Sequence, residues 1–370
     1  MTMIYADNAA TTELDIDAFE AMRPFLLQQY GNASQPYSFG TESKKALRNA
    51  RQIIARCIGA DPEEIFFTSC GTESDNWAIK MGAILGKRIV TSVIEHHAIL
   101  NSCATLEKQG IAVSYIPVDD VGEVLPGELE KVIGVDTSLV SVMFANNEIG
   151  TVQSVKELAA IAHQHGALFH TDAVQVVGHI DVNVHELDVD MLSASAHKFN
   201  GPKGIGFLYI KKGTEISAFI DGGSQEAGRR AGTENVASAV AMAVALEKNC
   251  ANISANKKHL DELDDLLIKR LNESDLDYRR NGGRNHIPGN INLSFNGKEG
   301  EMILHRMDLK GICISTGSAC DSVKIQTSHV IKAIGVPDEY AAGTIRISLG
   351  RDNTFEEVVA IADALVSILK

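Results

Sequence analysis

Between residues 64 and 210, short apolar segments alternate with segments of helical periodicity, and this alternation limits the choice of fold most strongly. The apolar segments are rich in β-branched and aromatic residues and are short enough to be strands. Strands that alternate with helices and are buried on both faces form mostly parallel sheets. We therefore expect an α/β fold with a seven-stranded sheet. Strands are predicted at 64–68, 88–93, 112–116, 139–144, 167–171, 190–194 and 205–210, and helices at 72–85, 98–108, 126–133 and 155–165.

The pattern changes after about residue 250. Leucines at helical spacing over 260–271 are followed by strand-like segments at 291–295, 312–315 and 345–349. The last helix opens with a capping-box pattern at 354–357. This predicts a smaller α+β domain formed by residues 1–14 and 251–370, beside a large α/β domain over 15–250. The apolar helix expected at 236–249 lies at the junction.

Composition narrows the classes of function. The net charge of −14 argues against nucleic acid or an anionic membrane surface as the main partner. No apolar run approaches 18 residues, and Asp7 interrupts any signal-peptide pattern at the start. The six cysteines show no Cys-x-x-Cys spacing, and the histidine pairs have no third ligand at helical spacing. We expect a cytoplasmic protein with reduced thiols, no metal and no membrane attachment.

Polar clusters follow five of the predicted strands. They lie at 69–72, 95–97, 146–150, 170–175 and 195–198. Ligands of open α/β sheets bind beyond the carboxyl ends of the strands, so these clusters predict one shared site. Because the cluster at 69–72 also opens a helix, its unpaired N–H groups suit a phosphate.

Lys198 lies between two predicted buried strands and is followed by a turn rich in glycine. A lysine in such a turn is either a solvated surface charge or an amine kept for chemistry. Desolvation and neighbouring cations lower the pKa of an amine, which favours attack on a carbonyl and formation of a Schiff base. The glycines at 201–206 have neither the P-loop spacing nor the Rossmann pattern.

Several motifs together resemble one family. The chain is similar to the pyridoxal-phosphate-dependent cysteine desulfurases of the NifS/IscS type, which belong to the class-V aminotransferases of fold type I. The resemblance runs essentially from end to end. The motifs that carry it are Asp7-Asn-Ala-Ala-Thr-Thr12, Thr72-Glu-Ser-Asp-Asn76, Asn146-Asn-Glu-Ile-Gly150, Asp172 with Gln175, His197-Lys198, Gly201-Pro-Lys-Gly204, Arg229-Arg-Ala-Gly-Thr-Glu-Asn235, Gly317-Ser-Ala-Cys320 and Arg346-Ile-Ser-Leu-Gly-Arg351.

The resemblance implies a cofactor site for pyridoxal 5′-phosphate. Lys198 would hold the cofactor covalently and then move protons, Asp172 would pair with the ring nitrogen, and His96 would stack on the ring and take part in proton transfer. The other implied ligands bind the edges of the cofactor. They are Gln175 and Asn147 at the phenolic oxygen, Gly71, Thr72, Ser195 and His197 at the phosphate, and Thr233 at the phosphate of a neighbouring subunit, which implies a homodimer.

The resemblance also implies the reaction. L-Cysteine would become L-alanine, with the substrate carboxylate held by Arg346 and by Asn147. Cys320, in a stretch of small residues that indicates a mobile loop, would take the sulfur as a persulfide and pass it to an acceptor. The long segment between Cys320 and Arg346 is similar to the iron–sulfur-cluster-assembly branch. The resemblance implies a sulfur-acceptor or iron–sulfur scaffold protein as partner, and a role in iron–sulfur cluster or thio-cofactor biosynthesis.

Two alternatives remain open. A selenocysteine lyase or a related cysteine or cystine lyase has the same fold, and a non-catalytic sulfur carrier would belong to another class. The sequence also departs from the family pattern at Cys70, where glycine is usual, and at Tyr37, where histidine is common. Cys70 is either a bystander or a second reactive thiol. The unusual residues Asp321, Val323 and Lys324 affect the choice of partner.

Overall fold

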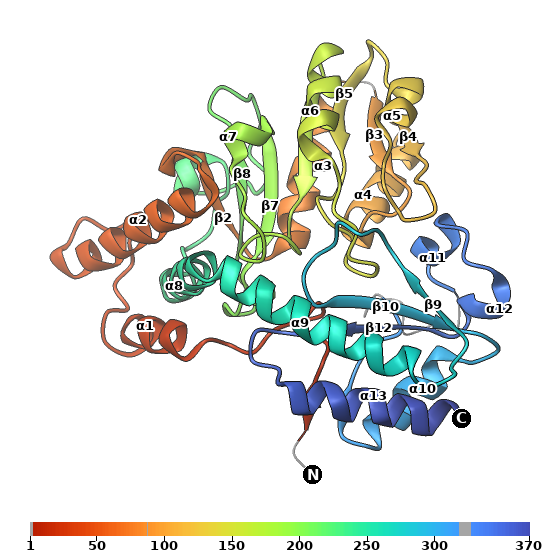
Figure 1. Cartoon of the computed structure of the whole chain (residues 1–370). Coiled ribbons are helices and arrows are strands. Elements are labelled where there is room, and N and C mark those ends of the chain that lie inside the picture. Colours follow the sequence, from red (N-terminus) through yellow and green to blue (C-terminus); the bar gives the residue numbers. More distant parts are fainter. Residues whose placement is uncertain (1–2, 87, 318–326) are drawn as a thin grey trace.

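The computed structural model describes residues 3–86, 88–317 and 327–370. Its centre is a seven-stranded sheet in the order β2-β8-β7-β6-β5-β3-β4 (Figure 1). β3, β4, β5, β6 and β7 pair in parallel, whereas β8 is antiparallel to both β7 and β2. The sheet is thus mostly parallel, as predicted. Its strands are β2 (Ile65–Thr68), β3 (Arg88–Ser92), β4 (Ala112–Ile116), β5 (Thr137–Ser141), β6 (Leu168–Asp172), β7 (Met191–Ser195) and β8 (Gly206–Ile210).

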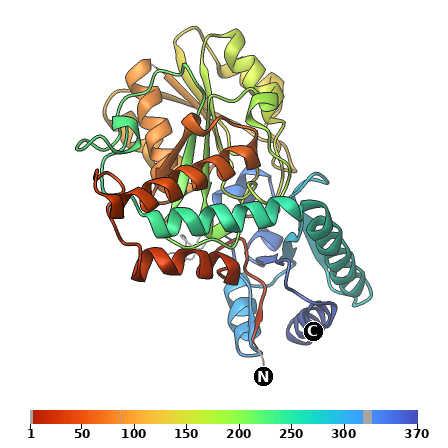
Figure 2. The same ribbon diagram turned by 90° about the vertical axis from the view of Figure 1, so that its left-hand side faces the viewer.

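Helices cover both faces of this sheet (Figure 2). One face packs on α3 (Gly71–Leu85) and α4 (His97–Lys108), with Trp77 and Ile99 fully buried against the strands. The opposite face packs on α6 (Val155–Gln164), α5 (Pro126–Val132) and α7 (Val184–Leu187). On that side α8 (Val236–Ala251) lies between α1 (Ile16–Leu27) and α2 (Ser38–Ile58).

A second hydrophobic cluster combines Ala6 with residues from 260 to 369. Its antiparallel sheet has the order β12-β10-β9, formed by β9 (Tyr278–Asn281), β10 (Asn290–Phe295) and β12 (Thr344–Ser348). The helices are α9 (Ile253–Asn272), α10 (Gly300–Asp308), α11 (His329–Ala333), α12 (Asp338–Ala341) and α13 (Phe355–Leu369). Because the two largest clusters lie mainly on opposite sides of the α8–α9 junction, we propose the division at residues 14/15 and 250/251.

The N-terminal segment, residues 3–12, reaches across to this second part of the chain. β1 (Ile4–Tyr5) pairs in parallel with β11 (Ile312–Cys313), and Asp7 forms a bridge to Ser348 on β12. We call residues 3–12 the N-terminal arm. Further on, Thr12 Oγ1 donates to His197 O at 3.0 Å, so the arm also contacts the turn between β7 and β8.

The predicted elements agree closely with the observed ones, apart from one shifted strand, the strand predicted at 312–315, which ends at Cys313, and elements that were not predicted, which include α7 and β1. All predicted bounds between 64 and 210 lie within one residue of the structure except 139–144, which is observed as β5 at Thr137–Ser141. Residues 142 and 144 still bond to β6 through their backbone, so the apolar run continues past the strand assignment. α1 and β9 were not predicted, because Pro24 interrupts the helical pattern of α1 and β9 carries charged residues.

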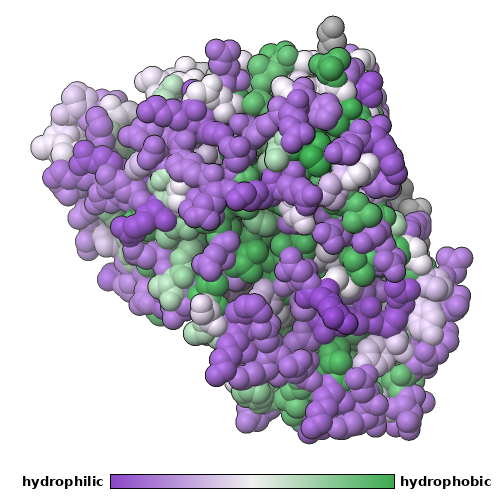
Figure 3. Space-filling model, turned by 45° about the horizontal axis from the view of Figure 1, so that its top comes forward, coloured by the Kyte–Doolittle hydropathy of each residue, from purple (hydrophilic) through white to green (hydrophobic). Residues whose placement is uncertain are grey.

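The capping box predicted for the last helix is present, with Thr354 and Glu357 bonding reciprocally. The surface seen in Figure 3 is mostly hydrophilic, with hydrophobic residues in smaller groups between polar ones. No helix within the described residues has the length and apolar character that a membrane crossing requires.

Candidate active site

A cavity of about 240 Å³ opens where the polar loops after the strands meet the N-terminal arm. All five polar clusters predicted at strand ends contribute to its wall. The residues that line it are Ala9, Ala10, Cys70, Gly71, Thr72, Asp75, His96, Met143, Asn147, Asp172, Val174, Gln175, Ser195, His197, Lys198 and Arg346. Of the site residues predicted from the sequence, the cavity brings together all but Thr233 and Cys320.

Lys198 ends a short 3₁₀ turn, Ala196–Lys198, between β7 and β8. Its Nζ donates to the carbonyl oxygens of Ala9 at 2.6 Å and Ala10 at 2.8 Å. The lysine is half-buried, so its amine is held by the arm inside the cavity and is not a solvated surface charge. The backbone of Lys198 is fixed as well, since its carbonyl accepts from His179 Nε2 at 2.8 Å.

Asp172 and His96 form the buried, titratable part of the cavity. Asp172 is the last residue of β6, and its Oδ1 accepts from the Val174 N–H at 2.9 Å. Burial raises the pKa of Asp172, and nearby His96 and Lys198 oppose this shift. His96 caps α4, with its Nδ1 accepting from the Ala98 N–H at 3.1 Å. Burial lowers the pKa of His96, so the imidazole is favoured in its neutral form with the proton on Nε2.

The first turn of α3 forms one wall that suits an oxyanion. Gly71 and Thr72 begin the helix, where backbone N–H groups have no intrahelical acceptor. Opposite them, Ser195 Oγ is buried, and no described residue bonds to it. Gly71 is required by packing, because a Cβ there would lie 2.6 Å from Val174 Cγ2. An anion held at this wall would give the Ser195 hydroxyl the partner it lacks.

His197 adds a neutral polar group to the same wall. Its Nδ1 lies 3.1 Å from Thr11 Oγ1, so the arm orients the ring. Burial, with Lys198 and Lys203 nearby, lowers the pKa of His197 to about 4. The imidazole is therefore neutral at pH 7 and can donate or accept a hydrogen bond without adding charge.

Arg346 lies on β12 with its side chain only 2% exposed. Its Nη2 lies 2.7 Å from Asp7 Oδ1, and its Nη1 donates to the backbone carbonyl of Asn147 at 2.9 Å. The sequence predicted Arg346 as a ligand of a carboxylate but gave Asp7 no role. Gln175, another predicted residue, donates from Nε2 to Ala9 O at 3.0 Å and so shares the acceptor of Lys198.

A buried polar network adjoins the cavity. The sequence analysis included His170 in the cluster at 170–175 and Asp75 in a family motif, but gave neither residue a role. His170 lies within β6 and contacts Ser141 Oγ through Nδ1 and Ser193 Oγ through Nε2, both at 2.9 Å. Asp75 Oδ1 lies 3.8 Å from His170 Nε2, and burial together with Asp172 raises the pKa of Asp75 well above its usual range. A polar residue inside an apolar strand, and a second polar residue one turn after Thr72, were the available signals.

Of the two remaining predicted residues, one lies elsewhere and the other is outside the part of the chain that the structure describes. Thr233 is exposed and does not line the cavity. Cys320, like Asp321, Val323 and Lys324, lies outside the described residues. Cys70, the departure from the family pattern, is half-buried at the start of α3 and lines the cavity.

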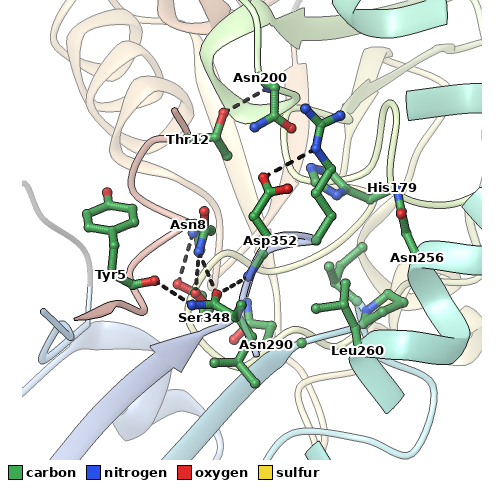
Figure 4. Close-up of a pocket in the computed structure, with 18 of the residues that line it drawn as sticks. Tyr5, Asn8, Thr12, His179, Asn200, Asn256, Leu260, Asn290, Ser348 and Asp352 are labelled. Carbon is green, nitrogen blue, oxygen red and sulfur yellow. Dashed lines mark hydrogen bonds and ion pairs between the residues drawn. The ribbon is translucent and has the colours of Figure 1, made fainter. Parts of the chain in front are cut away.

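A second cavity of about 260 Å³ adjoins the first and shares Ala9 and Gln175 with it (Figure 4). It is lined by the arm, by the turn after β12 and by residues of α8 and α9. Asn8 Nδ2 donates to Ser348 O at 3.0 Å, and Thr12 Oγ1 accepts from the Asn200 N–H at 2.8 Å. The arm is thus fixed by contacts on this side of the active site too.

The mostly parallel α/β sheet, with helices on both faces and a smaller α+β part beside it, places the chain in the fold type I class. The class-V aminotransferase family model matches residues 4–361. A cysteine desulfurase IscS from Dictyoglomus turgidum is 50% identical over 372 residues, which cover 99% of this chain and 94% of the relative.

Two solved structures are similar over nearly the whole chain. A NifS-like protein superimposes with a TM-score of 0.94 at 38% identity, covering 100% of this chain and 99% of the other. A structure described as SspA in complex with cysteine has a TM-score of 0.84 at 33% identity, covering 95% of this chain and 100% of the other. The chain belongs to the class-V aminotransferase family, and within it to the cysteine desulfurases of the NifS/IscS type. The predicted family and fold are confirmed.

Proposed function

We propose that this cysteine desulfurase binds pyridoxal 5′-phosphate, converts L-cysteine to L-alanine and leaves the sulfur on Cys320 as a persulfide. The observation that carries the proposal is the convergence of Lys198, Asp172 and Arg346 on one cavity, although they lie on three different elements. The amine of Lys198 suits a carbonyl cofactor, and the buried carboxylate of Asp172 suits the ring nitrogen of that cofactor. The guanidinium of Arg346 suits an amino acid substrate.

The residues present fit the cofactor. Lys198 would attach it, Asp172 would bind its ring nitrogen, His96 would lie against its ring, and Gln175 with Asn147 would reach its phenolic oxygen. The orphaned Ser195 hydroxyl, together with Gly71, Thr72 and His197, would hold its phosphate. When bound, pyridoxal phosphate supplies an electron sink for the carbanion that forms at the substrate α-carbon.

The chain's own groups handle the substrate and its protons. Arg346 and Asn147 would hold the substrate carboxylate, and the bound cysteine of the SspA structure is a relative's precedent for the substrate. Lys198 Nζ would carry protons to and from the α-carbon of the substrate. His96 suits proton transfer through Nε2, because its Nδ1 is already committed to the Ala98 N–H.

Cys320 would complete the reaction as a nucleophile. Its thiolate attacks the substrate sulfur, the new S–S bond forms as the C–S bond breaks, and the electron pair of the C–S bond stays with the three-carbon fragment. That fragment takes up a proton and leaves as L-alanine. A second thiol then removes the sulfur from Cys320, and an acceptor or iron–sulfur scaffold protein is the proposed recipient. A chain of net charge −14 supports a protein partner and not nucleic acid, and we propose a cytoplasmic setting.

The surface of α1 supports a homodimer. Its exposed large apolar side chains include Ile16 at 66%, Leu26 at 54% and Leu27 at 67%, and Tyr30 follows the helix at 71%. Exposed apolar groups in this concentration are typical of an interface. We propose that a second copy covers them and that Thr233, exposed in the single chain, reaches the phosphate of the partner's site.

Single-turnover labelling tests the proposal. The protein is loaded with pyridoxal phosphate and mixed with L-cysteine without reductant; alanine is quantified, and the persulfide is located by peptide mass. One alanine per site with the extra sulfur on Cys320 is expected, and Cys320→Ser should remove both.

Sulfur on Cys70 would assign the nucleophile to that thiol, for which Cys70→Ser is the matched variant. Activity on selenocysteine that survives Cys320→Ser would favour a selenocysteine lyase, and failure to bind the cofactor would favour a non-catalytic carrier.

A further inference from the structure

Asp7 contacts the guanidinium of Arg346, the one guanidinium among the described residues that line the active site. The arm places it between β11 and β12: the Ala6 N–H donates to Cys313 O at 2.9 Å, and the Asn8 N–H donates to Ser348 O at 3.0 Å. With both neighbours fixed by backbone bonds, the Asp7 carboxylate is directed at Arg346, two residues before Ser348 on β12. The pair joins residues 339 positions apart in the chain.

The guanidinium of Arg346 is fully enclosed. Nη1 donates to a backbone carbonyl, that of Asn147, and Nη2 contacts Asp7 Oδ1. Nε is buried and has no partner among the described residues. The backbone of Arg346 is held as well, through bonds to Ser315 in both directions. Both terminal nitrogens of Arg346 are thus already engaged, and a carboxylate that binds at Nη2 meets Asp7 there.

Asp7 is the partner that can move. Its side chain is 19% exposed, whereas the side chain of Arg346 is 2% exposed and the Asn147 carbonyl belongs to a buried backbone. A carboxylate that binds at Nη2 shares this nitrogen with Asp7 or replaces its bond, and two carboxylates at one guanidinium repel each other.

We propose that Asp7 is an internal counter-ion that competes with the substrate carboxylate for Arg346. This inference rests on the proposed role of Arg346 in substrate binding. Without a ligand, Asp7 compensates the buried charge of Arg346; with a ligand, its own charge weakens the grip on any carboxylate, including that of the product. Such an arrangement favours release of L-alanine and raises the substrate concentration that half-saturates the enzyme.

The test measures carboxylate binding directly. L-Alanine, and propionate as a probe that lacks the amine, are titrated into the cofactor-loaded chain by calorimetry. Competition predicts that Asp7→Asn binds both probes more tightly, by roughly tenfold, the effect of one charge-assisted hydrogen bond. A role in orienting Arg346 alone predicts the opposite sign. Asp136→Asn, which neutralises the carboxylate in a peripheral pair with Arg88, is the matched control and should bind as the wild type does.

Stability provides the second measurement, because Asp7→Asn leaves the buried charge of Arg346 uncompensated. Its melting temperature should fall, and L-alanine should restore it by a larger increment than in the wild type. Asp7→Glu is the variant to use if Asp7→Asn does not fold, because it keeps the charge on a longer side chain. It should bind L-alanine no more tightly than the wild type does. Weaker or unchanged binding of L-alanine to Asp7→Asn, or tighter binding of L-alanine to Asp7→Glu, overturns this inference and leaves the proposed function standing. Unchanged binding in Arg346→Lys removes the proposed role of Arg346, and the inference with it.

Discussion

The amine of Lys198 donates to the carbonyl oxygen of Ala9 at 2.6 Å, although the two residues are 189 positions apart in the chain. The same oxygen accepts from Gln175 Nε2 at 3.0 Å. The N-terminal arm therefore supplies two acceptors for the amine and, through Asp7, one acceptor for the guanidinium of Arg346. The amine proposed to bind the cofactor and the guanidinium proposed to bind the substrate both contact this one segment.

Replacing Lys198 by alanine should abolish alanine production from cysteine and leave the fold intact. The side chain is half-buried and donates to the backbone carbonyls of Ala9 and Ala10, and its removal leaves the backbone bond from His179 Nε2 to the carbonyl of residue 198 in place. Turnover and circular dichroism are measured together. Borohydride reduction followed by peptide mass should place the cofactor on the peptide that contains residue 198 in the wild type.

Lys203→Ala is the matched control, since Lys203 is an exposed lysine of the same loop. It should keep both turnover and the reduced adduct. Undiminished turnover in Lys198→Ala would remove the proposed covalent role of Lys198.

The acid limb of the pH–rate profile should lie below the ordinary histidine range. Burial lowers the pKa of His96, so the imidazole stays neutral as the pH falls through 6.5 and becomes protonated only at a lower pH. A side chain that transfers a proton in the reaction contributes on the order of 100-fold or more, and His96→Gln should lose that much in kcat/KM. His165→Gln, at the distant end of α6, serves as the control. A limb that lies above pH 6.5 and disappears in His96→Gln would contradict the assignment.

Much of the site could be predicted from the sequence because its residues follow strands. The carboxyl ends of parallel strands meet at one edge of a sheet. Because the clusters follow strands, the sequence already predicted that Gly71, His96, Asp172 and Lys198 lie close together. The alternation of strands and helices gave the sheet itself. These are local patterns, which a single chain displays directly.

Contacts between distant segments could not be predicted from local patterns. The pairs Asp7–Arg346 and Lys198–Ala9 depend on how the arm crosses to β12, and no local spacing records that path. The buried carboxyl of Glu95 was also missed, because a charged residue after a strand is usually solvated. The side chain is fully buried, and its carboxylate accepts from Ser92 Oγ at 2.5 Å and from the Met143 N–H at 3.0 Å.

Glu95→Gln should stabilise the protein increasingly as the pH rises. Burial raises the pKa of Glu95 to about 8, from an ordinary value of 4.5 in the unfolded chain. The unfolded state therefore loses its proton first, and stability declines as the pH rises from 4.5 through 8. Relative to the wild type, the unfolding free energy of Glu95→Gln should grow by on the order of 2–3 kcal/mol between pH 6 and pH 9.

Urea unfolding at the two pH values measures this change. Glu107→Gln is the control, since Glu107 is an exposed residue on α4 and should show no comparable pH dependence. An equal effect of Glu95→Gln at pH 6 and pH 9 would show that Glu95 keeps the same charge in the folded and unfolded protein over this range.

Thr233→Ala should weaken retention of the cofactor in a dimer and leave the single-chain fold unchanged. Thr233 is exposed and does not line the cavity of its own chain, so its hydroxyl can act on the phosphate only across an interface. Loss of one hydrogen bond to an ionised phosphate corresponds to about 1.5–3 kcal/mol, or roughly 10- to 150-fold in the dissociation constant of the cofactor. Equilibrium dialysis measures retention, and sedimentation velocity measures the oligomeric state.

Leu27→Asp separates the two parts of this prediction, because it puts a charge on the exposed apolar surface of α1 while Thr233 is intact. If the site is shared, the variant should sediment as a monomer and lose the cofactor to at least the extent that Thr233→Ala does. Thr214→Ala, a threonine in the turn after β8, provides the control for a side-chain change away from the interface. A monomeric Leu27→Asp chain with wild-type retention of the cofactor would show that each chain completes its own phosphate site, and the assignment of Thr233 would then be wrong.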